Sequence, residues 1–399
     1  MSIFRNIKEG LADASYIWRE EMRMMVRDEG VLLFCLVMPL FYPLLYSWVY
    51  NNEVVREVPV AVVDASKSSL SRQFIREVDA TSDVRVAGYA NSIDEARRMV
   101  ESQEVHGFYY IPADFAAQVY RQQSTYISTY VDMSIMLHYK AIYQAAVAVS
   151  TDMNKAIQIR QLGNTTDRQD EIATQPLDFE EVAIFNPTGG YGNFILPGVL
   201  ILIIQQTMLL GIGLAAGTAR ERNRFEDLVP IMHHYHGMLR IVLGKGLAYF
   251  MVYLLMGTYL TVVVPRLFHF VHLAQPLELA GILLPFLLAC IFFGQLVSCV
   301  VRYRENVLLL IVFTSVPLLF LSGAVSWPLS NMPGVWQGVS WLFPSTFGVR
   351  AFVRCQLMGA TLSDIAPECI ALWVQAAVYF VLACLVYRHQ IHETQRHAG

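Results

Sequence analysis

Residues 219–245, ARERNRFEDLVPIMHHYHGMLRIVLGK, form a short charged segment between two long apolar stretches. Arginines and acidic residues alternate in its first part, and three histidines follow. Before this segment the chain has one isolated apolar run, a long polar region and the first of the two apolar stretches, whereas nearly everything after it is apolar. The segment therefore predicts a cytoplasmic loop at a membrane surface, with two unequal halves of the chain on either side of it.

The composition is that of a membrane protein. Of the 399 residues 55% are hydrophobic and 16% are charged, and the mean hydropathy is +0.41, which excludes an ordinary soluble enzyme. Because the hydrocarbon core requires roughly 20 apolar residues in helical form, we expect a polytopic α-helical membrane protein with six transmembrane helices. The six windows are residues 31–50, 194–216, 241–265, 279–301, 307–327 and 369–387.

Basic residues predict the orientation, because cytoplasmic loops near membrane spans carry an excess of lysine and arginine. With the N-terminus inside, the inside segments hold thirteen basic residues, and the short outside segments hold three, Arg266, Arg350 and Arg354. Both termini, including a tail at residues 389–399, are therefore expected in the cytoplasm, and residues 51–193 outside it.

Residues 1–30 are expected to form an amphipathic helix at the cytoplasmic interface. The alternative is a simple helical extension of the first span that contacts nothing specific. Apolar residues recur at steps of three and four along this segment; they are Phe4, Ile7, Leu11, Ala14, Trp18, Met22 and Met25.

Residues 51–193 have the pattern of an inserted extracytoplasmic α/β domain. Short β-rich runs at 58–63, 84–89, 105–111 and 126–131 alternate with helical segments, and parallel strands require such crossover connections. Asp64 and the serines after it are expected to cap a turn and a helix rather than to catalyse a reaction. The region holds 12 basic and 19 acidic residues, a balance that does not suit nucleic acid.

Residues 327–367 combine prolines, glycines and aromatic residues between the last two spans. Irregular backbone at membrane depth must be shielded by protein, so short re-entrant or interfacial helices are expected here, on the outer side. Cys355 and Cys369 lie in or near this region. They either form a disulfide in an oxidising compartment or remain two small buried apolar side chains.

In the loop at 217–240, alternating charges and interspersed apolar residues predict a short amphipathic helix that docks in a cleft of a partner. The alternative is a plain solvated linker. No further ligand stands at metal-site spacing from His233, His234 and His236, so a metal site is not expected. The long stem of Lys245 is expected to reach the cytoplasmic interface from within the third span.

Several sequence motifs of energy-converting and catalytic proteins are absent. The chain has no GxxxxGK[ST] phosphate loop, no HExxH and no GxSxG, and its spans contain no pair of carboxylates. We therefore expect neither an enzyme nor an ion-driven carrier, but a protein that receives energy from outside the membrane.

Five strings in this order resemble the membrane subunit of ABC-2-type exporters. These bacterial permeases have one span, a large extracytoplasmic domain and five further spans. The strings are PVAVVDASKSSLS at 59–71, VHGFYYIPADFA at 105–116, NPTGGYGNFILPG at 186–198, RERNRFEDL at 220–228 with LGK at 243–245, and LSGAVSWPLSNMPGVWQGVSWLFPSTFGVRAFVR at 321–354.

The resemblance implies a permease that pairs with a second copy or a paralogue and with two cytoplasmic ABC ATPase subunits. ATP and Mg²⁺ would bind to those subunits and no cofactor to this chain, and a periplasmic adaptor protein is a further candidate partner. Lys245 matches the family's lysine after the coupling loop, while Asn223 to Phe225 replace its usual glycine. The residues assigned to ATPase coupling are Arg220, Glu221, Arg222, Arg224, Phe225, Glu226, Asp227 and Leu228.

The expected function is ATP-driven export of a hydrophobic or amphipathic compound, such as a drug-like molecule, a lipid or a glycolipid. Export would start from the cytoplasm or inner membrane of a bacterium and follow a path at the interface of the permease dimer. The alternative is a membrane-anchored binding or scaffold protein whose external domain recognises a periplasmic partner.

Overall fold

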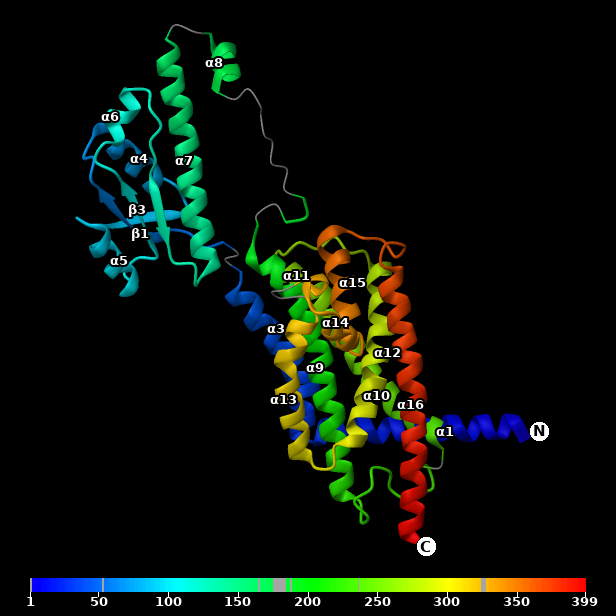
Figure 1. Cartoon of the computed structure of the whole chain (residues 1–399). Helices are drawn as coiled ribbons and strands as arrows, with labels where there is room; N and C mark the ends of the chain where they lie inside the picture. The colour runs from blue at the N-terminus through cyan, green and yellow to red at the C-terminus, as the bar shows by residue number, and fades with distance from the viewer. Residues whose placement is uncertain are drawn as a thin grey trace. The chain divides into compact units, whose positions relative to one another are not determined.

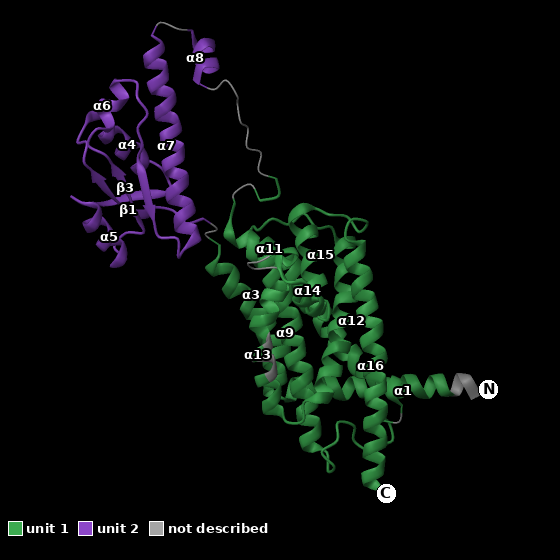
Figure 2. Ribbon diagram, viewed as in Figure 1, with its two compact units in different colours: residues 1–53, 183–399 green, residues 54–182 purple. Residues whose placement is uncertain are grey.

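The computed structural model describes residues 2–51, 54–163, 166–174, 184–186, 189–235, 237–323 and 328–399. Side chains are described in these ranges except at residues 2–5, 310–312 and 314. The chain divides into two compact units, shown in different colours in Figure 2: unit 1 is Met1–Glu53 with Ala183–Gly399, and unit 2 is Val54–Val182. Unit 1 is built of helices, and unit 2 of a β-sheet with helices on its faces.

Unit 1 contains five helical segments, among its described residues, that are long and apolar enough to cross a membrane. The chain is therefore a polytopic helical membrane protein. These segments are Glu29–Val49, comprising α2 (Glu29–Leu32), the π-helical turn η1 (Leu33–Val37) and α3 (Met38–Val49); α9 (Tyr191–Arg222); Met238–Leu267, comprising α10 (Met238–Thr258), η2 (Tyr259–Val263) and α11 (Val264–Leu267); α12 (Pro276–Val300); and α16 (Ala366–Ala398).

A sixth span was predicted at residues 307–327, and α13 (Arg304–Leu321) lies there. The end of that window, residues 324–327, is outside the described residues. The count of six spans stays a prediction.

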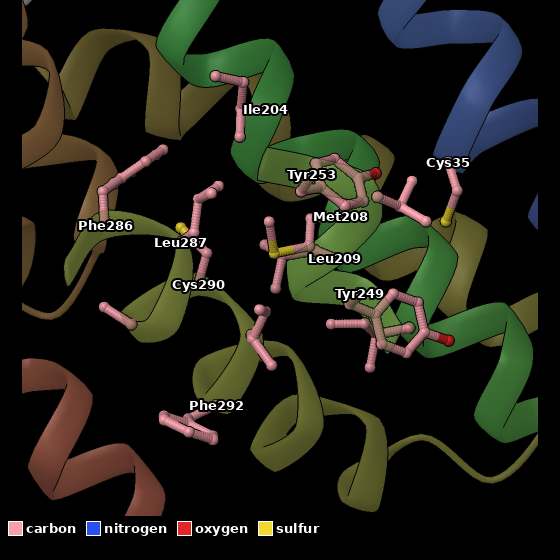
Figure 3. Packing of buried hydrophobic residues seen from close by; sticks show 14 of the residues in the cluster. Cys35, Ile204, Met208, Leu209, Tyr249, Tyr253, Phe286, Leu287, Cys290 and Phe292 are labelled. Carbon is pink, nitrogen blue, oxygen red and sulfur yellow. The ribbon is translucent and has the colours of Figure 1, made fainter. Parts of the chain in front are cut away.

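α9 is the central helix of unit 1. In its most apolar window 83% of the residues are buried, against 28–67% in the other four segments. Figure 3 shows side chains of α9, such as Met208 and Leu209, among those of α10 and α12. Glycines bring neighbours close: a Cβ at Gly213 would lie 2.5 Å from a methyl group of Val307. Such small residues let membrane helices pack tightly.

α1 (Ser2–Arg27) runs across the bundle rather than along it (Figure 1). It packs against α10 and buries Ile17 and Met25 completely or nearly so. At Gly244 of α10 a Cβ would lie 2.9 Å from the carbonyl oxygen of Ala14, so the two backbones approach closely there. A helix is therefore present over the predicted segment and has a specific partner, α10, whereas its place at the cytoplasmic interface stays a prediction.

Short helices follow α13 in the described residues from 328 onward, where short re-entrant or interfacial helices were expected. They are η3 (Leu329–Asn331), α14 (Gly334–Ser340) and α15 (Pro344–Met358). Cys355 and Cys369 are both free, and the Cys355 thiol donates to the carbonyl of Ala360 at 3.1 Å. No disulfide therefore joins them; Cys355 is buried, as the second alternative predicts, whereas Cys369 is half-buried.

Unit 2 has a four-stranded sheet in the order β2-β1-β3-β4. β1 pairs in parallel with β2 and β3, and β4 is antiparallel to β3. Residues of β1 alternate between two cores, one beneath α4 and α7 and one beneath α5. The elements are β1 (Val58–Asp64), α4 (Ser69–Asp79), β2 (Val84–Tyr89), α5 (Ile93–Glu101), β3 (Gly107–Ile111), α6 (Phe115–Tyr120), β4 (Ser128–Val131), α7 (Met136–Leu162) and α8 (Asp167–Thr174).

Polar side chains after β1 cap the next helix, as the sequence predicted. Ser68 is the N-cap of α4 and exchanges two hydrogen bonds with Ser71, each of 3.0 Å. Asp64 accepts from the backbone N–H of Lys67 at 2.9 Å and from the hydroxyl of Ser71 at 2.8 Å. These contacts account for Asp64 and the serines without a catalytic role.

Candidate functional site

The charged loop begins at the end of α9, and the helix predicted for it is absent. Residues 223–229, all of them described, form turns and bends, whereas Arg220 to Arg222 are the last turn of α9. The Asn223 side-chain amide donates to the carbonyls of Asp227, at 2.8 Å, and Val229, at 3.3 Å, which folds the loop back. Glu226 has a φ of 57°, a left-handed conformation that interrupts a helix. The prediction of a short docking helix is therefore wrong.

Arg220, which was assigned to the docking surface, lies inside unit 1. Its side chain is buried, and its guanidinium donates to the carbonyls of Ser298, at 3.2 Å, and Cys299, at 2.9 Å. Both carbonyls belong to the last turn of α12, where helical carbonyls lack an intrahelical partner. Arg220 therefore joins the ends of α9 and α12.

Asp227 and Leu228, also predicted to dock, are buried against the end of α16. A carboxylate oxygen of Asp227 lies 3.2 Å from Nδ1 of His397, and the backbone N–H of Leu228 donates to the side chain of Gln390 at 3.4 Å. The ring of Phe225 lies 6.2 Å from that of His397. Residues 389–398, predicted as a tail, continue α16 and hold this loop. No spacing in the sequence indicated this pairing.

Four of the eight assigned residues are exposed: Glu221, Arg222, Arg224 and Glu226. We call them the exposed charge row. Two carry positive and two negative charge, and the guanidinium of Arg224 lies 5.7 Å from the centre of the half-buried Phe225 ring. This row, rather than the whole segment 220–228, is the surface available to a partner.

A second cluster at the same end of unit 1 was not predicted. Three acidic residues of α1 and its end, Asp13, Glu21 and Asp28, are buried although they are ionisable. Because they are eight and seven residues apart, they lie on one side of the helix. We call them the acid seam. Each contacts a different basic side chain from beyond residue 230.

Asp13 binds the loop and the start of α10. One carboxylate oxygen lies 2.8 Å from Nδ1 of His234, and the other is paired with Arg240. His234 also stacks on Tyr16, with ring centres 4.3 Å apart. In the part of the chain that the structure describes, which omits His236, no group of three potential ligands can hold a metal ion.

Glu21 binds Lys245, which was expected to reach the cytoplasmic interface. Instead both side chains are less than a tenth exposed, and the Lys245 Nζ lies 3.1 Å from Oε2 of Glu21. The hydroxyl of Tyr249 donates to Oε1 of the same carboxylate at 3.2 Å. The snorkelling prediction is wrong because a buried acid from α1 is available to pair with the ammonium group.

Asp28 stands between α1 and α2 and makes the largest set of contacts. Its carboxylate caps α2 by accepting from the N–H groups of Gly30, at 3.0 Å, and Val31, at 3.2 Å. It also accepts from the Thr218 hydroxyl at 2.8 Å and from Arg304 at 2.7 and 3.0 Å. One side chain thus joins α1, α2, α9 and α13.

The acid seam makes stability depend on pH. Burial raises the pKa of Asp13, but hydrogen bonds and charges from His234 and Arg240 outweigh it and lower the pKa below the ordinary value of 3.8. The folded pKa is thus lower than the unfolded one, so this contribution is complete above about pH 4 and is lost as the pH falls through the folded pKa.

We therefore expect Asp13→Asn to be less stable than wild type at pH 7, and we expect this difference in stability to disappear in acid. The measurement is the difference in unfolding midpoint between wild type and variant, in one detergent, from pH 7 down to pH 2.5. This difference in unfolding midpoint should be constant down to about pH 4 and should become smaller below it. A gap that stays constant to pH 2.5 would show that ionised Asp13 does not contribute.

An apolar cavity of about 370 Å³ lies between the first helical segment, α9 and α13. Aromatic and aliphatic side chains such as Tyr42 and Leu202 form most of its wall. Gln206 also lines it; the side chain is half-buried, and its two buried amide atoms have no hydrogen-bond partner among the described residues. An unpaired buried amide is costly, so this one is suited to a ligand's polar group. In the sequence, a glutamine within an apolar span was the one signal that could have indicated this polar group.

Residues 30–385 match a family model described as "ABC-2 family transporter protein". No match was found among curated proteins. The matched region includes the exposed charge row, the cavity, Lys245 and Arg304, and begins just after the acid seam.

Proposed function

Because the chain belongs to the ABC-2 family of transporter proteins, we propose that it is the permease subunit of an ATP-binding-cassette exporter. Members of this family are membrane subunits that work with an ATPase subunit. ATP and Mg²⁺ would bind to that subunit, and the permease would act with a second copy or a paralogue. The cargo is a hydrophobic or amphipathic compound, such as a drug-like molecule, a lipid or a glycolipid.

The observation that carries this proposal is the exposed charge row at the end of α9. Its first two members, Glu221 and Arg222, belong to the same helix as the apolar span. Movement of a partner bound to this row would therefore be transmitted directly to the central helix of unit 1. Residues 227–229 are buried against the bundle and α16, which supports a loop that moves as one body with the spans.

The cavity beside α9 supports the choice of cargo. Its wall is apolar, and Gln206 offers one unpaired amide, the combination that binds an amphipathic molecule. Large apolar side chains are exposed on the neighbouring helices, among them Phe41 and Trp48 of α3 and Phe313 of α13. Lipid or a second permease copy would cover them.

The test is the double charge reversal Glu221→Lys/Glu226→Lys. We expect transport by reconstituted complexes to fall at least about tenfold, which corresponds to about 1.4 kcal/mol of coupling free energy. ATP hydrolysis by the co-purified ATPase should no longer respond to the permease. Both residues are exposed, so the thermal stability of the permease should not change.

The matched control is Glu101→Lys/Glu104→Lys, which makes the same charge change at two exposed positions of unit 2. This control should transport like wild type. Unchanged transport by the charge-row variant would disprove the coupling role. Failure of any ATPase to co-purify after gentle extraction would favour the alternative, a membrane-anchored binding protein.

A further inference from the structure

Unit 2 contains a hollow of about 570 Å³ at the carboxyl ends of β1 and β2. Asp64, the last residue of β1, and Lys67 in the loop after it form one side, and Tyr89, the last residue of β2, and Asn91 in the loop after it form the other. A hollow of this volume accommodates a small organic molecule.

The topology of the sheet explains why the hollow lies there. β1 continues into α4, which packs on the face carrying Val60 and Val62. β2 continues into α5, which packs on the opposite face with Ala61 and Val63. The two connections therefore leave adjacent parallel strands in opposite directions and open a crevice between them. In open α/β sheets ligands bind outside the carboxyl ends of the strands, and this hollow lies at the carboxyl ends of β1 and β2.

Three cations surround this crevice: Lys67, Arg72 and Arg76. All three are exposed, and none forms an ion pair with another residue in the described ranges. Arg72 and Arg76 are one helical turn apart on α4, and Arg72 is held by a hydrogen bond of 3.0 Å to the carbonyl of Lys67. Arginine pairs of this kind bind the oxygens of phosphate and carboxylate groups.

The one acid that lines the crevice is already engaged. Both carboxylate oxygens of Asp64 accept local hydrogen bonds, from the Lys67 N–H and the Ser71 hydroxyl. Residues 51–193 as a whole hold 19 acidic and 12 basic residues, so a site lined by three cations is a local reversal of the domain's charge. Such a reversal attracts anions to this place rather than to the rest of the domain.

The remaining wall is apolar and aromatic. Ile75 and Ala90 are buried and line the crevice, and the Tyr89 ring is 67% exposed beside them. An exposed tyrosine next to a cationic crevice offers a flat apolar surface to a ligand that also carries a charge. The site therefore combines an apolar part with an oxyanion-binding part.

We propose that this crevice binds an amphipathic organic anion. Its phosphate or carboxylate group lies against Arg72, Arg76 and Lys67, and its apolar or aromatic part lies against Tyr89 and Ile75. This site is separate from the cavity beside α9, and the proposal does not rest on the proposed export function.

The experiment measures binding of 1-naphthyl phosphate to the full chain by titration calorimetry at pH 7.5. The protein is held in nanodiscs of zwitterionic phosphatidylcholine. We expect saturable binding that weakens at high salt. The double variant Arg72→Ala/Arg76→Ala should bind at least about tenfold more weakly, as the loss of charge-assisted hydrogen bonds predicts. Arg76→Glu, which leaves the hydrogen bond from Arg72 to Lys67 intact, should also lose affinity.

The matched control is Arg97→Ala/Arg98→Ala on α5, which removes two exposed arginines of the same unit, one of them likewise hydrogen-bonded to a backbone carbonyl. This control should bind the probe like wild type. The uncharged analogue 1-naphthol should bind wild type and all variants with the same affinity. The proposal is overturned if the probe does not saturate, if both double variants lose affinity equally, or if loss of Arg72 and Arg76 weakens 1-naphthol as much as the phosphate.

Discussion

Replacing Glu21 by glutamine is expected to destabilise the protein by about 3–5 kcal/mol, because it leaves the Lys245 ammonium buried without a counter-charge. The two side chains are only 5% and 9% exposed and lie 3.1 Å apart, so water cannot replace the lost carboxylate. Glutamine has the size of glutamate and can still accept from the Tyr249 hydroxyl, so the change removes charge rather than volume. The measurement is the unfolding midpoint in a fixed detergent.

The adjacent residue provides the control for Glu21. Glu20 pairs with Arg23, but those side chains are 35% and 47% exposed, and exposed pairs contribute only about 0–1 kcal/mol. Glu20→Gln should therefore leave the unfolding midpoint nearly unchanged. In the double variant Glu21→Gln/Lys245→Met neither charge of this pair remains, so most of the stability should return. If Glu21→Gln and Glu20→Gln cost the same, the buried pair has no special role.

The Glu21–Lys245 pair also shows which features could be predicted from the sequence and which could not. Length and hydropathy were sufficient for five long apolar helices. The step of three and four predicted the helix α1, although Ile7 and Leu11 of the predicted stripe are exposed. Glu21 stands four residues from both Ile17 and Met25, which are buried, so the helical period already placed a carboxylate on the packed side. What periodicity could not supply was the partner, because Lys245 is 224 residues away and only the packing of α1 on α10 joins them.

The charged loop failed as a prediction for a related reason. Its alternating charges suggested a helix with one polar face, but burial in residues 220–228 is decided by contacts with distant segments. Arg220 is buried by the end of α12 and Asp227 by the end of α16. In unit 2 the alternation of strands and helices predicted parallel pairing, because crossover connections are local. The crevice at the ends of β1 and β2 depends on which face each helix covers, and the sequence pattern did not specify that.

Substitutions of Asp28 should separate two contributions that one carboxylate makes. Asparagine is as good an N-cap as aspartate, so Asp28→Asn should keep the cap of α2 and lose the charged contact with Arg304. We expect a loss of about 1.5–3 kcal/mol, the range for hydrogen bonds to charged groups. Asp28→Ala should cost about 1 kcal/mol more, because it also removes the cap. Unfolding midpoints of both variants measure the difference.

The relative stabilities of Asp28→Asn and Asp28→Ala test what holds the junction between α1 and the first helical segment. Asp28 has extended backbone between the last residue of α1 and the first of α2, so its cap fixes the point at which the chain turns. Arg304→Met should match Asp28→Asn if the charged contact is the shared loss, and the two together should cost less than their sum. Equal stability of the asparagine and alanine variants would mean that the cap contributes nothing. Additive losses for Asp28→Asn and Arg304→Met would mean that α13 does not stabilise this turn through Asp28.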